Sequence, residues 1–268
     1  MTMSPIGEIL ETVGLSAEDV TVESAGGATG RSWKVSTADG QFALRLASSP
    51  ESGDRQATAI AAAAAAGLPV QQVVRRSSAV LLLSWAPGVP IAHAARSEPA
   101  LAFELGRLMG ETQHRLHQIP PPPELARIPT SPQAAGSGFP GPDALLHGDW
   151  HVYNILVDTT GLSCILDWEN AVGGHPLADV ARTYSLFTID PALESLTTDE
   201  RTALRRLADG WAAGYGPEAI SIPASYLAWA GRIMQDDLAP RYLDRPDALT
   251  KLQTWTEQWE RRAAESTL

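Results

Sequence analysis

Residues 145–170 of the 268-residue chain read LLHGDWHVYNILVDTTGLSCILDWEN. Two short apolar runs flank the turn-forming residues 158–161, a pattern typical of a β-hairpin. Asn154 directly precedes the first run and Asp167 directly follows the second, so a hairpin would bring them side by side. Asp149 would lie on the loop that enters the first strand. Magnesium in a phosphate site takes one or two protein oxygens and leaves its other positions to water and phosphate. The stretch therefore predicts a magnesium-phosphate site with a free carboxylate beside it.

The segments 147–149 (HGD) and 167–169 (DWE), with Asn154 between them, carry a resemblance to a known family. Their order and spacing resemble the catalytic signature of the aminoglycoside phosphotransferase family, a small-molecule branch of the protein-kinase-like fold. The resemblance implies that Asp149 is the catalytic base and that Asn154 and Asp167 hold Mg²⁺. It also implies an ATP- or GTP-dependent phosphotransferase that acts on a hydroxyl group of a small molecule, either an antibiotic or a metabolite.

Other interpretations of this stretch stay open. A lone His-Gly-Asp is most often a simple turn, but three polar positions at kinase spacing favour a kinase-like site. Imidazole-rich sets suit zinc or iron, so a metallohydrolase is a rival, with His147, Asp149, His151, Asp167 and His175 as its ligands. That alternative leaves the asparagine unexplained. A nucleotide-binding pseudokinase that serves as an interaction module is the other rival, which the intact polar positions disfavour.

Composition limits the partners of the chain. A formal net charge of −11 argues against nucleic acid, whose binding depends on basic patches. No apolar run approaches the roughly 20 residues of a membrane span, and no signal-peptide pattern opens the sequence. The single cysteine, Cys164, excludes an internal disulfide and fits a reducing cytoplasm. The acid excess lies mostly past residue 90 and includes Asp236, Asp237 and Glu257, which favours a cationic or amine-bearing acceptor.

The first part of the chain predicts a sheet with helices. Segments with strand character are 20–24, 31–37, 41–47, 70–75 and 79–84. We expect a short helix at 4–14 and an Ala-rich helix at 51–66. Gly27 and Gly30 belong to a glycine-rich turn between the first two strands, where backbone N–H groups can approach a phosphate without obstruction.

Arg45 is a single basic residue in an otherwise apolar strand. The resemblance places it where these kinases keep the cation that holds the nucleotide's phosphates, a role that guanidinium suits well. Lys34, one strand earlier, ranks lower. Gln56 stands where the family has a glutamate that pairs with this cation, so we expect Gln56 to accept a hydrogen bond from Arg45, or another acid such as Asp54 to substitute.

The apolar segment around Leu83 and Trp85, followed by Pro-Gly, predicts a hinge where a nucleotide base would lie. We therefore expect an α+β, two-lobed protein-kinase-like fold. Residues 1–84 would form a nucleotide-binding lobe with a five-stranded antiparallel sheet and a helix, and 85–90 the hinge. Residues 91–268 would form a mainly helical lobe that binds the acceptor.

In that second lobe we expect helices near 98–118, from Thr197, near 222–238 and near 246–264, and an extended proline-rich loop at 120–142. His114 and His117 are interpreted as surface residues near the end of the first of these helices. By the resemblance, Asp179 braces the loop that carries Asp149.

Overall fold

The structure is a computed structural model that describes residues 5–26, 30–128 and 143–266. In its first half, α1 (Pro5–Thr12) precedes β1 (Thr21–Ser24), β2 (Ser32–Thr37), β3 (Gly40–Leu46), α2 (Pro50–Ala65), β4 (Val73–Ser77), β5 (Val80–Ser84) and β6 (Val89–Pro90). The α-helices and strands that follow are α3 (Ile91–Ser97), α4 (Ala102–Leu116), β7 (Ala144–Leu146), β8 (Ile155–Asp158), β9 (Gly161–Ile165), β10 (Val172–Gly174), α5 (Pro176–Thr188), α6 (Thr198–Tyr215), α7 (Ala224–Leu238) and α8 (Thr250–Glu265).

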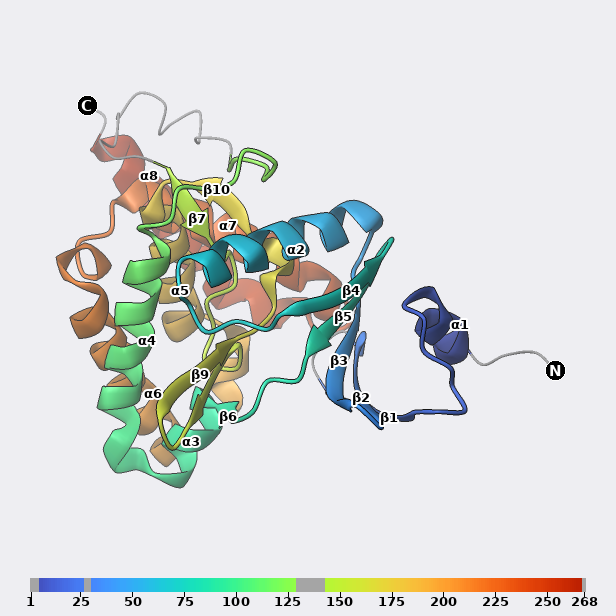
Figure 1. Ribbon diagram of the computed structural model, residues 1–268. Coiled ribbons are helices and arrows are strands. Elements are labelled where there is room, and N and C mark those ends of the chain that lie inside the picture. Colours follow the sequence, from blue (N-terminus) through green and yellow to red (C-terminus); the bar gives the residue numbers. More distant parts are fainter. Residues whose placement is uncertain (1–4, 27–29, 129–142, 267–268) are drawn as a thin grey trace.

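The predicted five-stranded antiparallel sheet is confirmed, with the strand order β1-β2-β3-β5-β4. Side chains of β5 alternate between its two faces. Val80 and Leu82 join the apolar cluster that contains α1, whereas Leu81 and Leu83 join the cluster that contains α2. The sheet is therefore a layer between α1 and α2 (Figure 1). One predicted boundary was wrong: β4 begins at Val73 and not at residue 70, because Val70 pairs with β9 instead.

The second half of the chain is mainly helical, as predicted, and lies on the other side of α2 from α1 (Figure 1). In this half, α4 and α6 pack against each other with their backbones very close. Each helix contributes two glycines four residues apart, Gly106 and Gly110 on α4 and Gly210 and Gly214 on α6. A Cβ atom added at any of the four would come within 2.1 Å of a backbone carbonyl oxygen on the other helix. The short helix α3 was not predicted from the sequence.

Residues 85–90 connect the sheet to the helices, and we propose them as the link between two lobes at the predicted boundaries. The five-stranded sheet ends at Ser84, and β6 pairs with β8 instead of joining that sheet. Gly88 adopts a φ of +107°, and a Cβ atom there would lie 2.6 Å from the carbonyl oxygen of Val157. The Ser163 hydroxyl donates to the Pro87 carbonyl at 2.8 Å. The proposed link is thus fastened to the β8–β9 hairpin.

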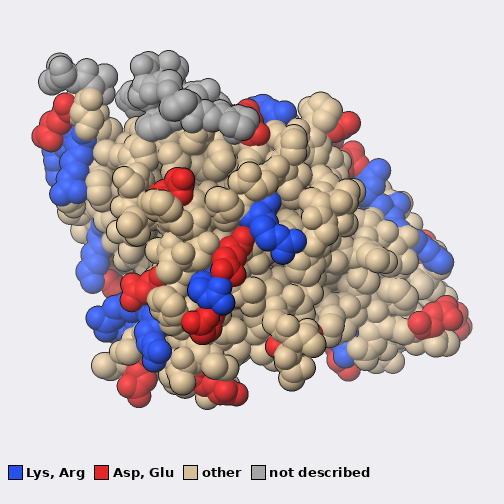
Figure 2. Space-filling view, turned by 60° about the vertical axis from the view of Figure 1, so that its left-hand side comes forward, with Lys and Arg blue, Asp and Glu red and all other residues tan. Residues whose placement is uncertain are grey.

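The described surface mixes charges. On the face drawn in Figure 2, acidic and basic side chains are interspersed among broad areas of other residues. Within the described ranges, every helix is too short or too polar to cross a membrane.

Candidate active site

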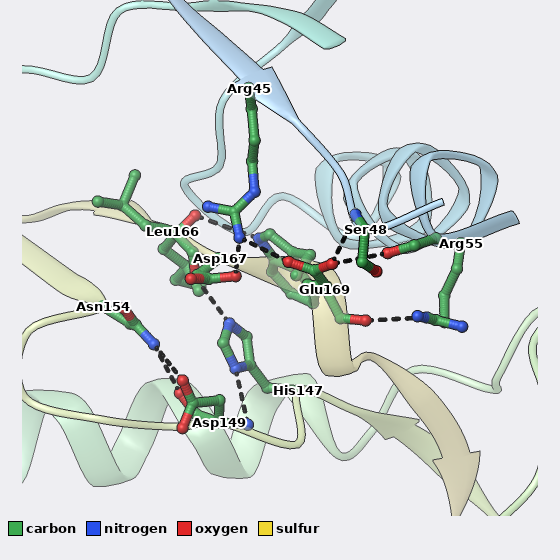
Figure 3. Close-up of polar contacts among 12 residues, drawn as sticks. Arg45, Ser48, Arg55, His147, Asp149, Asn154, Leu166, Asp167 and Glu169 are labelled. Carbon is green, nitrogen blue, oxygen red and sulfur yellow. Dashed lines mark hydrogen bonds and ion pairs between the residues drawn. The ribbon is translucent and has the colours of Figure 1, made fainter. Parts of the chain in front are cut away.

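Strands β8 and β9 form the predicted hairpin around residues 158–161. The Leu166 N–H donates to the Asn154 carbonyl at 2.8 Å, so Asn154 lies opposite the residue that precedes Asp167. The Asn154 side-chain amide donates to the Asp149 carboxylate and to the Asp149 carbonyl, both at 3.0 Å. We term residues 147–153, the loop before the hairpin, the HGD loop. Asp149, Asn154 and Asp167 thus lie at one end of the hairpin (Figure 3).

The orientation of Asn154 follows from its partner. An ionised carboxylate only accepts hydrogen bonds, so the amide nitrogen of Asn154 must face Asp149 and the amide oxygen is left for another partner. Asp167 has a φ of +59°, a left-handed conformation that is uncommon for a residue with a side chain and is often found at functional sites. Its side chain is 34% exposed. An amide oxygen and a partly exposed carboxylate form a donor set that fits Mg²⁺.

His147 is fully buried between the rings of Trp150 and Trp168. The Asp149 N–H donates to its Nδ1 at 3.3 Å, so the proton of the neutral ring is on Nε2, which donates to the Leu166 carbonyl at 2.8 Å. Both ring nitrogens are therefore engaged, and His147 fixes the HGD loop against the end of β9.

The imidazole-rich set of a metallohydrolase does not assemble. His147 is engaged as described, and His175 accepts the Leu177 N–H at the start of α5. Across residues 5–26, 30–128 and 143–266, no group of three or more His, Cys, Asp or Glu side chains is placed to hold a metal ion. The described residues therefore do not bring the ligand set of the metallohydrolase alternative together.

Asp179 lies fully buried on α5 and accepts the Gly148 N–H at 2.8 Å and the His147 N–H at 3.2 Å. His117 contacts the same carboxylate at 3.1 Å. Burial alone would raise the pKa of Asp179, but the hydrogen bond and charge of His117, with the Gly148 N–H, lower it below the ordinary value. The expected bracing role of Asp179 agrees with these contacts. The expectation that His117 lies on the surface was wrong, because its ring bridges Asp179 and the Tyr215 hydroxyl.

Arg45 reaches the end of β9 from β3 (Figure 3). It lies on the same face of β3 as Ala43, which is the face toward α2. Its Nη2 donates to the Asp167 carboxylate at 2.5 Å and to the Glu169 carboxylate at 3.2 Å. Its Nε atom is buried and has no hydrogen-bond partner among the described residues.

The other predicted nucleotide residues are placed as follows. Gly27 lies outside the described residues. Gly30 has a φ of +63°, and a Cβ atom there would meet nothing within 4 Å. Leu83 is buried in the sheet, at 3% exposure. The Lys34 ammonium, from β2, lies 5.1 Å from the centre of the Trp85 ring. Trp85, the first residue of the proposed link, therefore lies beside the sheet.

A second set of charges lies on the helical side of Asp149. Arg182 is buried and pairs with Asp237, and its Nε and Nη1 atoms have no hydrogen-bond partner within the described part of the chain. Burial lowers the pKa of His151, and the Asp149 and Asp190 charges partly oppose this shift. Burial also raises the pKa of Asp237, against the effect of Arg182.

Comparison with known proteins decides the family. The profile of the phosphotransferase enzyme family matches residues 21–137 and 124–229. The chain belongs to this family. The protein is therefore a phosphotransferase of the small-molecule kinase type. A search of curated proteins finds no match.

Solved structures of phosphotransferases share the fold of this family member. The aminoglycoside phosphotransferase APH(4)-Ia, in a ternary complex with ADP and hygromycin B, has a TM-score of 0.61 at 15% identity over 95% of this chain and 98% of that one. APH(3'')-Id from Streptomyces rimosus has a TM-score of 0.58 at 17% identity, over 85% of this chain and 97% of that one. The macrolide 2'-phosphotransferase MphH from Brachybacterium faecium has a TM-score of 0.53 at 18% identity, over 93% of this chain and 98% of that one.

The phosphotransferase departs from the pairing expected for Gln56. Gln56 is buried at 1% exposure, and its amide nitrogen has no hydrogen-bond partner among the described residues. Asp54 pairs with Arg76 and so does not substitute. Arg45 instead contacts Asp167 and Glu169, because full carboxylate charges form stronger hydrogen bonds than a neutral amide. Sequence reasoning missed Glu169, although its place two residues after Asp167 could have suggested it.

Proposed function

We propose that this phosphotransferase transfers the γ-phosphoryl group of Mg²⁺-bound ATP to a hydroxyl group of a small molecule. One arrangement supports the proposal above all. Asn154 hydrogen-bonds to Asp149 and lies opposite the residue before Asp167, while Arg45 contacts Asp167 from the sheet. A base, two metal-binding oxygens and a phosphate-binding cation are the groups that phosphoryl transfer to an alcohol requires.

The residues divide the work as follows. Asp149 orients the acceptor hydroxyl and receives its proton. The Asn154 amide oxygen and the Asp167 carboxylate hold the magnesium, which neutralises charge on the phosphate oxygens when bound. Arg45, which reaches the site from the sheet, donates to the phosphates. Such transfer depends mainly on positioning and on charge stabilisation.

The nucleotide base would lie beside residues 83–85, and its phosphates would lie near Gly30. ATP is our first choice of co-substrate, since the APH(4)-Ia structure holds ADP, and GTP is the alternative to compare. A screen of ADP and GDP release against a panel of hydroxylated antibiotics, amino alcohols and sugars would identify the donor and the acceptor class. Nucleotide binding without turnover of any compound in the panel would count against the proposed acceptor classes.

The role of Asp149 is tested by Asp149→Asn, which keeps the shape of the side chain and removes the base. We expect turnover to fall by about 10² to 10⁴-fold, the usual contribution of a general base, while binding of Mg²⁺-ATP stays the same. Asp209→Asn, on the exposed face of α6, is the matched control. A variant that retains parental turnover would exclude Asp149 as the base.

The metal ligands are tested separately by Asp167→Ala. Calorimetry should show that Mg²⁺ strengthens ATP binding to the parent and has little effect on ATP binding to the variant. Equal ATP affinity with and without Mg²⁺ in the parent would contradict the assignment of Asn154 and Asp167.

A further inference from the structure

A cavity of about 150 Å³ lies directly beside the HGD loop. Its walls come from α3, from residues 150–153, from the end of α5, from the 3₁₀ turn Pro191–Ser195 and from α6. Most of the lining is apolar, with Leu186, Phe187, Leu193, Leu204 and Leu207 among its members. None of the residues assigned above to the nucleotide or the metal lines this cavity.

The cavity is close to the proposed base. Trp150 and His151 line it, and they are the two residues that follow Asp149. Because a residue spans at most about 3.6 Å of chain, the Cα atoms of Asp149 and His151 are no more than about 7 Å apart. The Asp149 charge also acts on the His151 ring. The cavity therefore lies next to the part of the HGD loop that carries Asp149.

Polar groups mark the rest of the lining. Asp190 and His151 belong to the wall, as does the ion pair of Arg96 and Glu200, whose charged atoms are 2.9 Å apart. Trp150 is fully buried, and its Nε1–H has no hydrogen-bond partner among the described residues.

We propose that this cavity is the acceptor subsite for an apolar group of about the size of benzene. An engineered apolar cavity of about 150 Å³ in another protein binds benzene, which sets the scale. The proposal rests on the proposed function and narrows it: the acceptor is an amphiphilic alcohol whose apolar part occupies the cavity while its hydroxyl reaches Asp149.

Toluene is the probe for this proposal, because it is apolar, of the right size and has no hydroxyl group to phosphorylate. Its binding to the full chain can be followed by ligand-observed NMR. Ala192 is an exposed residue that lines the cavity, so Ala192→Leu should fill part of the cavity without disturbing the fold. Ala92→Leu, on α3, fills the cavity from a second wall. Ala100→Leu, exposed in another 3₁₀ turn and outside the cavity, is the matched control.

We expect toluene to bind the parent and Ala100→Leu equally. It should bind the filled variants about tenfold more weakly or worse, because the added leucine occupies the space that the ring would take. Toluene should also compete with the best acceptor from the screen but not with ATP. Turnover without toluene binding, or without competition, would overturn the subsite and leave the proposed function intact. If no alcohol is phosphorylated, both proposals fall, whatever toluene does. Equal binding of toluene to all four proteins would place it elsewhere and also overturn the subsite.

Discussion

Glu169 joins three parts of the molecule through one side chain. Its carboxylate accepts the Arg45 guanidinium at 3.2 Å, the Ser48 N–H at 3.0 Å and the Ser52 hydroxyl at 3.1 Å. Its carbonyl accepts from Arg55 of α2 at 2.8 Å. Burial alone would raise the pKa of Glu169, but the hydrogen bonds of Ser48 and the charge of Arg45 lower it. Glu169 therefore stays ionised and can supply the charge that Gln56 lacks.

Glu169→Gln should weaken ATP binding. The substitution keeps the side-chain shape but replaces charge-assisted hydrogen bonds with neutral ones, which are about half as strong. A loss of about 1.4 kcal/mol corresponds to a tenfold rise in the ATP KM, and kcat should change less. Steady-state kinetics measures both values, with Glu257→Gln, exposed on α8, as the control. An unchanged ATP KM would show that Arg45 does not depend on Glu169.

Asp179 should make stability depend on pH. Its pKa is lower in the folded chain than in the unfolded chain, so its contribution is complete above the unfolded value of about 3.9 and is lost as the pH falls toward the folded value. Asp179→Asn breaks a buried charged network and should cost about 3–5 kcal/mol at pH 7. Urea unfolding should show the gap between parent and variant shrinking below about pH 4. A gap that is constant with pH would contradict this linkage.

At the scale of elements, the closely packed helices α4 and α6 contribute to the hydrogen-bond network of Asp179, which holds the HGD loop. Gln113 and His117 at the end of α4 contact Asp179, and Tyr215 of α6 contacts His117. The spacing of these two helices therefore sets the position of the network. The glycines between the helices are what permit that spacing.

Gly110→Ala should consequently destabilise the protein although alanine favours helices. The added Cβ atom would meet the Trp211 carbonyl oxygen at 2.1 Å, so the helices must separate. Overpacking of this kind costs about 1–3 kcal/mol or more, and turnover should fall as the brace shifts. Thermal unfolding measures the loss, and Ala213→Leu, which adds volume on the exposed face of α6, is the control. Equal stability of parent and Gly110→Ala would mean that the helices are not held by this contact.

Local patterns predicted the elements that depend on local sequence. The β8–β9 hairpin follows from two apolar runs around a turn, and this pairing places Asn154 opposite the residue before Asp167. The partners of Arg45 were mispredicted, because Asp167 and Glu169 lie more than 120 residues away in sequence and reach it only through tertiary packing. The helix α3 and the paired strands β7 and β10 are too short to show a hydrophobic periodicity, so the sequence did not predict them.

At the scale of the whole molecule, the distribution of charge bears on which acceptor would bind near Asp149. The chain carries a net charge of −11. Asp149 and Asp190 both act on His151, and Asp237 lies close enough to Asp149 to feel its charge. Arg182 offsets part of this negative charge through its pair with Asp237. The balance near the proposed base stays negative, which supports an acceptor that bears an amine as well as the apolar group proposed for the cavity.

An amine-bearing acceptor should therefore bind less well in salt. The Debye length falls from about 30 Å at 0.01 M to about 3 Å at 1 M ionic strength. An exposed ion pair worth about 1 kcal/mol would then be lost, which is about a fivefold rise in the acceptor KM. A neutral analogue of the same shape, measured in the same buffers, should show no such rise, and the Asp149→Asn effect on turnover should be the same at both salt concentrations. A confirmed acceptor that is neutral or anionic and binds equally well at both ends of this range would exclude the cationic class while leaving Asp149 as the proposed base.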